Sequence, residues 1–461
     1  MIETTRRAFR FTGLLAAGLS LVAVPARAQS TATLQGTVTD AQSAAVPGAA
    51  VSVKNVFTGV QRDVVTDNHG DYQVAALPVG LYRVEASAPG FQTQIAAEVR
   101  LEVARTVVQN FRLKLGGVAE EMTVTAEAPV IDTATSSVGQ VINQRTVQEI
   151  PLNGRHFVDL GLLIPGSVTP PQSGFLTAPL RGQGSFAFNT AGNREDTVNF
   201  MINGVNLNDM VQNQITFQPS INTVQEFKVD NQTFSAEYGR NSGAIVNIAT
   251  RSGTNAFHGE AFEFYRNDRF DARNFFNQAP VKKSSFSRNQ FGGNIGGPIA
   301  RNKTFFFLSY EGLRQRQGID INSPVLRADE RAAVTDAVSR GLLALIPEAN
   351  TVGSRGEGRF LGSATAPVNI DQWTGDLNHL FSASDTLHAY YAFQKDLRGE
   401  PVLQGNTIPG FGDTRQSHRQ IGTLNETHIF GQGLVNEARF GFNRIHITFS
   451  RTRSSTRRTT G

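Results

Sequence analysis

The sequence predicts a mainly β protein in three parts: a small β-sandwich, a mixed α/β segment, and an incomplete antiparallel transmembrane β-barrel. Composition is the first support for this prediction. Hydrophobic residues make up 39% of the 461 residues and charged residues 18%, which is too apolar for a disordered chain and too polar for a helical membrane protein. The 44 glycines and 32 phenylalanines favour strands and turns. The other two supports are the alternation of apolar and polar residues along the predicted strands and the alternation of short and long connections between them.

The N-terminus has the layout of an export signal. Three arginines among the first ten residues precede an apolar run at 11–24, and a small-x-small cleavage site, Ala26-Arg27-Ala28, follows. This pattern predicts a signal peptide over residues 1–28 and a mature chain that begins at Gln29. The apolar run is too short to be a comfortable membrane anchor, and no other stretch approaches the ~20 apolar residues of a transmembrane helix.

Residues 29–116 show short alternating strands separated by turn residues. Tyr72, Val74 and Ala76 alternate with polar neighbours, and a turn at residues 77–80 leads into a second alternating run. Strands of this kind at regular spacing predict a small sandwich. Asp67 and Asp71 suggest calcium, but a plain turn is favoured because the remaining ligand spacing is absent.

Five motifs in this segment resemble the carboxypeptidase-regulatory-like, transthyretin-type domain. They are Gly36-Thr37-Val38-Thr39-Asp40, Val46-Pro47-Gly48-Ala49, Gly70-Asp71-Tyr72, Leu77-Pro78-x-Gly80-x-Tyr82 and Pro89-Gly90-Phe91. The resemblance implies a transthyretin-like β-sandwich with no catalytic group.

Residues 117–255 are richer in Asn and Gln, and their alternation is broken. A short helical stretch is expected from Glu149 through Leu163, and the strand Phe200-Met201-Ile202 enters a tight Asn203-Gly204 turn. Together with Glu149-Ile150-Pro151-Leu152-Asn153-Gly154-Arg155 and the phrases at 237–255, these residues resemble the plug domain of TonB-dependent receptors, in the Oar-like group that carries the sandwich in front. The resemblance implies a mixed α/β plug.

Residues 256–461 alternate with period two, as expected for strands with one face toward lipid and the other toward the lumen. Phe440 and Phe442 are predicted to face lipid, and Arg439 and Asn443 to face the lumen. Seven strands are expected, near 256–266, 285–297, 303–316, 369–382, 386–397, 417–430 and 434–449.

The connections between these strands alternate in length. The second, fourth and sixth are tiny, whereas the first, third and fifth far exceed the about two to five residues of an ordinary hairpin. Barrels of the outer membrane have short periplasmic turns and long extracellular loops, so this pattern favours a barrel over a secreted sandwich. Seven strands cannot close, and an open edge in lipid would leave backbone groups unpaired, so we expect the chain to be a fragment.

Motifs for catalysis are missing from the sequence. There is no Walker A sequence, nucleophile elbow or HExxH, and the absence of Cys excludes thiolate metal sites, so no enzyme, cofactor or metal is expected. His379, His388 and His428 could face the lumen, but their spacing gives no ligand set. The net charge of +4 and a basic tail interpreted as a solvated loop do not indicate nucleic-acid binding.

One short segment between sandwich and plug is a candidate for energy coupling. Met122, Thr123, Val124, Thr125 and Ala126 resemble the TonB box, which implies a TonB-like periplasmic energy-coupling protein as partner. A β-prone strand can be captured by strand addition and then pulled. The alternatives are a linker strand or the last strand of the sandwich.

Three functions remain open at this point. The first is import by an outer-membrane TonB-dependent receptor, in which an unknown extracellular ligand binds and an energy-coupled plug rearrangement follows. The second is a non-transporting surface-binding or adhesion protein of the outer membrane. The third is a secreted carbohydrate-binding protein with no barrel. The first two require outer-membrane lipid around the strands and a periplasmic N-terminal domain.

Overall fold

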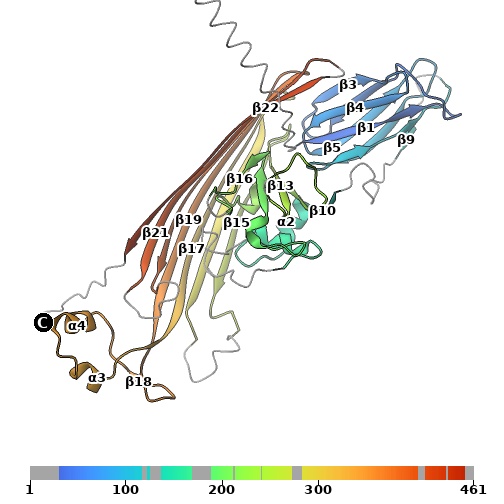
Figure 1. Cartoon of the computed structure of the whole chain (residues 1–461). Coiled ribbons are helices and arrows are strands. Elements are labelled where there is room, and N and C mark those ends of the chain that lie inside the picture. The colour runs from blue at the N-terminus through green and yellow to red at the C-terminus, as the bar shows by residue number, and fades with distance from the viewer. Residues whose placement is uncertain are drawn as a thin grey trace, which may run out of the picture.

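The computed structural model describes residues 31–116, 122–124, 137–168, 188–210, 213–239, 241–272, 283–402, 411–431 and 434–451. The predicted signal peptide and basic tail therefore lie outside the described residues, apart from Arg451. Three bodies follow one another along the chain: a sandwich, a central domain at residues 138–250, and a long barrel sheet (Figure 1).

The sandwich consists of two β-sheets. One has the order β4-β1-β7 with β8 beside β1, and the other has the order β3-β2-β5-β6-β9. Its strands are β1 (Ala32–Thr39), β2 (Ala50–Asn55), β3 (Gln61–Val65), β4 (Asp71–Leu77), β5 (Gly80–Ser87), β6 (Gln94–Leu101), β7 (Thr106–Val108), β8 (Phe111–Arg112) and β9 (Met122–Val124). Alternate side chains point inward, so that Tyr82, Val84 and Ala86 of β5 are 2%, 0% and 0% exposed. The predicted period-two pattern is confirmed.

The turn at Asp67–Asp71 closes on itself. The Asp67 carboxylate accepts hydrogen bonds from the backbone N–H of His69 at 2.8 Å and of Asp71 at 2.9 Å. These two bonds, with that from Asp71 the stronger influence, hold the pKa of Asp67 below its ordinary value. Gly70 has φ +78°, and a Cβ there would come within 2.6 Å of the Val38 carbonyl oxygen. Asp67 thus closes the turn by itself, as expected for a plain turn.

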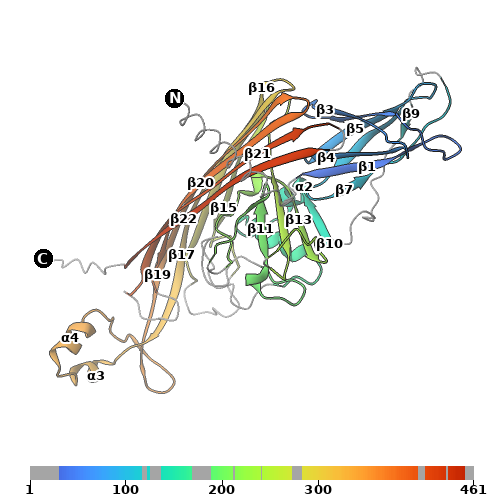
Figure 2. The same cartoon turned by 45° about the horizontal axis from the view of Figure 1, so that its top comes forward.

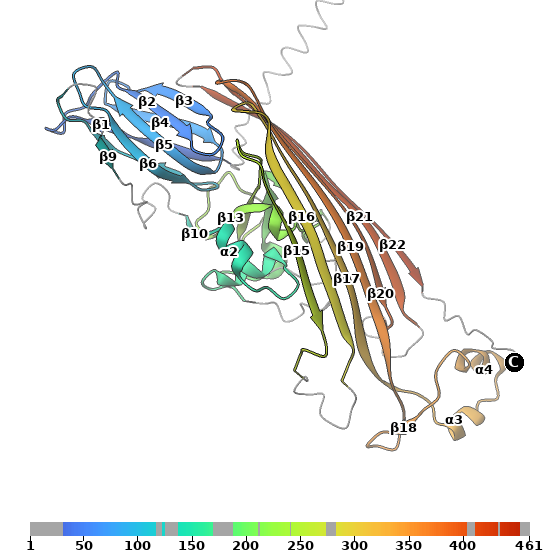
Figure 3. The same cartoon turned by 180° about the vertical axis from the view of Figure 1, so that it is seen from behind.

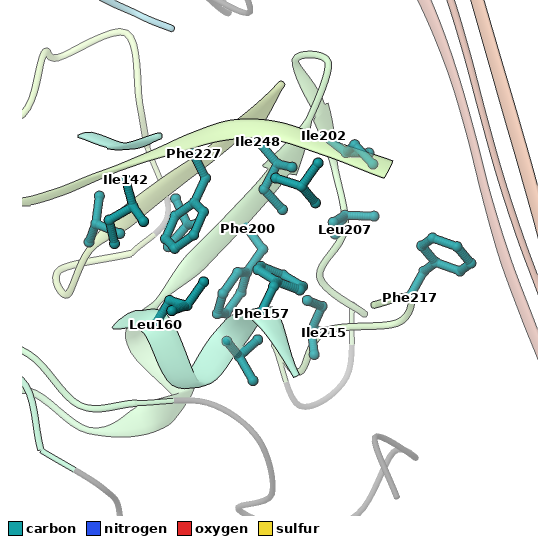
Figure 4. Packing of buried hydrophobic residues seen from close by; sticks show 14 of the residues in the cluster. Ile142, Phe157, Leu160, Phe200, Ile202, Leu207, Ile215, Phe217, Phe227 and Ile248 are labelled. Carbon is teal, nitrogen blue, oxygen red and sulfur yellow. The ribbon is translucent and has the colours of Figure 1, made fainter. Parts of the chain in front are cut away.

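The central domain is a five-stranded sheet with short helices on one side. The strand order is β10-β13-β14-β11-β12. The bounds are β10 (Val138–Asn143), α2 (Gln144–Glu149), η1 (Phe157–Leu163), η2 (Glu195–Thr197), β11 (Asn199–Ile202), β12 (Val205–Asn206), η3 (Ile221–Thr223), β13 (Val224–Gln232) and β14 (Ile245–Thr250). Figure 4 shows its apolar core, in which Phe157 meets Phe200 and Phe227 edge to face at ring distances of 6.4 and 6.0 Å.

The helical stretch expected from Glu149 through Leu163 is wrong in its bounds. Helix α2 begins after Asn143, whose side chain accepts from the Thr146 N–H at 3.0 Å, and it ends at Glu149. A proline disfavours helical torsions in the residue that precedes it, so Ile150 is extended ahead of Pro151. Helical structure resumes only as a 3-10 turn at Phe157. The predicted Asn203-Gly204 turn between β11 and β12 is confirmed, with φ of 47° and 79°.

The barrel sheet contains the seven predicted strands in the order β15-β16-β17-β19-β20-β21-β22, all antiparallel. Its strands are β15 (His258–Asn267), β16 (Phe286–Ala300), β17 (Thr304–Pro324), β19 (Gly358–Ser382), β20 (Asp385–Glu400), β21 (Asp413–Ile429) and β22 (Val435–Arg451). Strand β17 continues past its predicted end at 316 to Pro324, and β19 begins at Gly358, ahead of its predicted start at 369, because these two extensions pair with each other beyond the sheet. Helices α3 (Ala328–Ala332) and α4 (Ala337–Leu343) and strand β18 (Thr351–Val352) lie in the loop between them.

The two faces of this sheet follow the predicted alternation. Phe440 and Phe442 are 66% and 41% exposed on the outward face. Arg439 and Asn443 point inward, where Asn443 accepts from the Thr216 hydroxyl at 2.9 Å. The inward prediction also holds for His388, but it is wrong for His379 and His428, which lie beside the exposed outward rings of Phe381 and Phe430. Successive side chains of a strand point to opposite faces. His379 and His428 each lie two residues from an outward phenylalanine, so they point outward as well.

The three bodies are arranged along the barrel sheet. The sandwich lies at the end with the tight turns, and α3 and α4 lie at the opposite end (Figures 1 and 2). The central domain packs on one face of the sheet, as the view from behind also shows (Figure 3). Tyr390, Ala392 and Ile421 of the barrel sheet belong to the apolar core of the central domain. Among the described residues, no helix is both long and apolar enough to cross a membrane.

Candidate functional site

The candidate coupling segment lies on the edge of the sandwich. Met122–Val124 form strand β9, which pairs in parallel with Gln94–Ala96 of β6. Thr125 and Ala126 lie outside the described residues. A three-residue edge strand is held by few backbone hydrogen bonds, so its pairing is a weak attachment. The described part of the segment is therefore the last strand of the sandwich, which was one of the alternatives, and its role in energy coupling stays a prediction.

A polar clasp joins the sandwich to β13 of the central domain. The N–H of Val103, just after β6, donates to the Glu226 carboxylate. The Lys228 ammonium donates to the Ala104 carbonyl at 3.0 Å and lies 3.1 Å from the Asp230 carboxylate. Val103 and Ala104 pack with Ala249 of β14 in a small apolar cluster. Lys228 and Asp230 pair with each other within β13, whereas the bonds of Glu226 to Val103 and of Lys228 to Ala104 exist only while the sandwich is in place.

Burial raises the pKa of Glu226 to about 7, because the carboxylate is removed from water. The hydrogen bond from Val103 opposes this rise, Glu102 adds to it, and Arg100 weakly opposes it. The clasp therefore contains a carboxyl group that titrates near neutral pH. Sequence analysis missed it, because nothing local marks position 226 as the place where another domain docks.

The sandwich also contacts the start of the barrel sheet. The backbone N–H of Asn255 donates to the Phe57 carbonyl at 3.0 Å, and its side-chain amide donates to the Thr58 carbonyl and to Asn302, each at 2.6 Å. Asn302 belongs to the tight turn between β16 and β17. The sandwich thus abuts both the central domain and a turn of the barrel sheet.

The motif Asn153-Gly154-Arg155 meets the barrel wall. Asn153 accepts from Arg288 at 3.1 Å and from Arg266 at 2.8 Å. The Arg155 guanidinium lies 4.3 Å from the ring centre of Phe264, a cation–π contact. Gly154 and Arg155 have φ of 94° and 57°, a left-handed turn that points the motif at the wall. The sequence assigned these residues to a helical stretch and did not indicate this contact.

A second loop, residues 216–220, binds the wall through polar groups. The Ser220 N–H donates to Gln372 at 2.7 Å, and its hydroxyl donates to Glu311. Arg419 donates to the Thr216 carbonyl at 2.5 Å and pairs with Asp396 at 3.2 Å. Hydrogen bonds therefore fix this loop to the barrel sheet beside an apolar contact, because Phe217 of the loop belongs to the same buried cluster as Tyr390, Ala392 and Ile421 of the sheet.

A small polar cavity of about 40 Å³ remains between the two bodies, beside Gly154, His156, Ser220, Glu311 and Gln372. Room of this size suits a few water molecules and not a solute of substrate size. Burial, and then the Arg288 charge, lower the pKa of His156 to about 3, so this imidazole is neutral. We call the contact of residues 216–220 with Glu311, Gln372, Asp396 and Arg419, together with this cavity, the polar seam.

Three residues that could bind a metal ion lie close together, although their spacing in the sequence did not indicate a ligand set. Ligand atoms of Asp385, Glu426 and His428 lie within 4.8 Å of one another on the outward face, near the tight turns. Cross-strand pairing of β20 with β21 brings them together. All three are partly exposed.

Comparisons with known proteins agree with this architecture. Residues 33–114 match the carboxypeptidase regulatory-like domain. Residues 249–335 and 331–461 match the outer membrane beta barrel domain. Both matches fall on bodies that are described above as sheets.

One curated relative is the TonB-dependent transporter Oar of Myxococcus xanthus, 25% identical over 389 residues. The alignment covers 79% of this chain but only 35% of the relative, so the chain spans about a third of that protein's length. Among solved structures, the outer membrane transporter YddB of Escherichia coli has a TM-score of 0.46 at 11% identity, covering 67% of this chain and 39% of that one. The siderophore receptor PirA of Acinetobacter baumannii has a TM-score of 0.34 at 15% identity, covering 69% and 49%.

Proposed function

We propose that this chain, a homologue of the TonB-dependent transporters of the outer membrane, forms part of a receptor that binds an extracellular ligand and imports it. The observation that supports import is the polar seam between the central domain and the barrel wall. In this proposal the segment at residues 117–255, which contains the central domain, is a plug, the sandwich at 29–116 is periplasmic, and residues 256–461 contribute to the barrel.

The polar seam suits a plug that has to move. A hydrogen bond within a protein contributes only about 0.5–1.5 kcal/mol net, and about 1.5–3 kcal/mol where one partner is charged, because water replaces it when it breaks. Ser220 and Thr216 can therefore exchange their partners on the wall for water one at a time. The apolar part of the contact, where Tyr390, Ala392 and Ile421 join the core of the central domain, is the part that would have to be exposed to water at once.

A pull on the segment at 122–126 would reach the plug through its edge strand. Residue 126 precedes β10 by a short stretch of chain, and β10 is the outermost strand of the plug sheet. Tension enters β10 at Val138, whose partner is Gln232, so the antiparallel pairs would open in sequence from that end. Because the outer membrane has no ATP, the work has to arrive from a periplasmic partner that captures the strand by strand addition.

The test is to block strand capture without touching the plug. In the full-length receptor, Thr123→Pro removes a backbone N–H from the strand, and we expect uptake to fall at least 10-fold in a deletion strain given a panel of labelled substrates. Surface binding of the same substrate should be unchanged. Ala134→Pro, in the stretch between the segment and β10, is the matched control and should import normally.

Cross-linking separates capture from uptake. This chain contains no cysteine, so Thr123→Cys introduces one defined thiol. We expect a disulfide to a cysteine variant of the periplasmic energy-coupling protein, and more of it when substrate is present. Normal uptake by Thr123→Pro, together with no cross-link, would rule out import through this segment.

Pairing of β9 with β6 favours one other candidate, a surface-binding protein that does not transport. A strand that only completes the sandwich needs no periplasmic partner. In that case Thr123→Pro would weaken the sandwich only. Wild type and variant would both bind ligand at the cell surface, and neither would import it.

A further inference from the structure

A continuous row of aromatic rings crosses the outward face of the barrel sheet. Phe291 and Tyr310 lie 6.3 Å apart between ring centres, Tyr310 and Trp373 5.5 Å, and Trp373 and Phe393 5.7 Å. His418 continues the row, 6.1 Å from Phe393. Rings of this kind gather where the apolar band of a barrel meets the head groups of the membrane.

Basic side chains lie at and just beyond this row. Lys395 pairs across the strands with His418, His418 pairs with His446, and Arg444 pairs with Gln420. Directly paired side chains are about 5 Å apart, so these groups form one cluster, which we call the basic cluster: Lys395, His418, Arg444 and His446. Lys395, Arg444 and His446 are exposed, and His418 is partly exposed.

The depth of the basic cluster matches a membrane boundary. Lys395 is about ten residues from the start of β20 at Asp385, and Arg444 about nine from the start of β22 at Val435. At about 3.3 Å per residue and a tilt of about 45°, this places both cations roughly 20–25 Å from the turn end, the height of the apolar band of a barrel. The tight turns are the periplasmic end, so the cluster is level with the outer leaflet.

One carboxylate adjoins the cluster, that of Asp371, which is the direct cross-strand partner of Lys395. It forms no ion pair with Lys395 and is bound instead by the Tyr310 hydroxyl at 2.7 Å and by Arg314 at 2.6 Å. Within the described part of the chain, neither Lys395 nor Arg444 has an ion-pair partner. Two cations thus remain available to an anion at the membrane surface.

The surface is hollowed on both sides of the aromatic row. A hollow of about 260 Å³ is lined by Phe393, His418, Gln420, Arg444 and His446. A mainly apolar groove of about 630 Å³ lies on the turn side of the row, where Gly293 and Gly375 leave room between larger neighbours. The outward large side chains of this groove are Ile295, Leu308, Tyr310, Trp373, Tyr391 and Phe393. A polar head with negative charge fits the first hollow, and hydrocarbon fits the second.

We propose that this part of the outward face is a binding site for the phosphorylated glycolipid of the outer leaflet. The lipid phosphate lies against Lys395 and Arg444, His418 and His446 donate hydrogen bonds to the head group, and an acyl chain follows the apolar groove. Charge complementarity selects this occupant, because phosphate oxygens accept from Lys and Arg at a membrane surface. The site does not depend on import, since it faces lipid and not the lumen.

The test is lipid retention by full-length receptor purified in detergent, followed by native mass spectrometry with diphosphorylated lipid A. Each cation near a charged membrane surface changes affinity about 5-fold, so the double variant Lys395→Gln/Arg444→Gln should bind lipid A roughly 20- to 30-fold more weakly. Arg340→Gln/Arg355→Gln removes the same charge from the extracellular loop and should bind as wild type does. Lys395→Arg/Arg444→Lys keeps the charge and should also retain the lipid.

Two further arms identify the ligand. Dephosphorylated lipid should bind the wild type and the double variant equally, because only the phosphate contact differs. Inorganic phosphate at millimolar concentration should not displace lipid A. Equal retention of lipid A by the wild type and the double variant, or displacement by inorganic phosphate alone, would overturn the proposal. If the double variant fails to assemble, Gln420→Glu, which adds a carboxylate to the hollow, should weaken lipid A binding instead.

Discussion

The sandwich core and the seam between central domain and barrel wall are built in opposite ways. The sandwich core is a cluster of apolar residues, with Leu34, Val51 and Val84 each 0% exposed. The seam buries polar and charged groups, among them Gln372, Asp396 and Arg419. Burial of apolar surface is favourable without a particular partner, whereas a buried polar group needs its partner to be present. The sandwich is therefore held by apolar burial, and the seam depends on particular polar partners on both of its sides.

The largest effect is expected in the sandwich. Leu34→Ala should lower the free energy of unfolding of residues 31–116, expressed alone, by about 2–5 kcal/mol, because it leaves a cavity in a core that cannot collapse. Urea denaturation followed by circular dichroism measures it. Exposed Glu98→Ala should change stability by less than about 0.5 kcal/mol. A segment that unfolds without cooperativity would break the comparison, because the sandwich would then depend on its neighbours.

The next effect tests the barrel wall itself. Phe442→Arg places a charge on the outward face, which lipid covers in the proposed barrel, and should cost about 2–4 kcal/mol. Asn443→Arg places it on the inward face and should cost little beyond the contact with Thr216. The full-length variants can be compared by heat-modifiable gel mobility and by the fraction in the outer-membrane pellet. Equal assembly of both, or the reverse order, would show that the strand register is wrong.

The clasp should respond to pH through Glu226. Its pKa is raised to about 7, so the docked state holds a proton that the separated state releases near pH 4.5. Docking is therefore strongest below about pH 4.5, and it loses on the order of 3 kcal/mol as the pH rises from there through 7. Glu226→Gln, which can still accept from Val103, should remove this dependence.

Hydrogen exchange at the Val103 amide, corrected for its intrinsic pH dependence, measures the clasp in the full-length protein. Wild type should be less protected at pH 8 than at pH 5, and Glu226→Gln should be protected equally at both. Protection that rises with pH in the wild type would contradict the assignment of Glu226 as a protonated, docked group.

The smallest effect is expected in the seam. Ser220→Ala removes one hydroxyl from Glu311, which keeps its bond from Gln290, so the cost should be about 1 kcal/mol or less. Assembly should be normal, while hydrogen exchange across residues 216–222 should rise about 5-fold. Ser363→Ala, at an exposed position of β19, should leave that exchange unchanged. A loss as large as that of Leu34→Ala would mean that the seam is as rigid as the core.

Local pattern was enough to predict much of the fold. Alternation in β22 assigned Phe440 and Phe442 to the outward face, and a two-residue signal located the Asn203-Gly204 turn. The five sandwich motifs and the Oar-like motifs indicated a homology that the comparisons confirm. These features repeat every two residues or lie within one turn, so neighbouring residues carry the information.

Only the tertiary structure decided how the parts meet. Nothing near Met122 predicts that β9 pairs with β6, and nothing near Glu226 predicts a bond to Val103. The same limit explains the misplaced helix at 149–163, the outward positions of His379 and His428, and the convergence of Asp385 with Glu426. Such contacts join residues far apart in the chain, and they form because each partner's burial and hydrogen bonding depend on the other. The sequence by itself therefore determined the strands and their faces, and packing between strands and domains determined the clasp, the seam and the basic cluster.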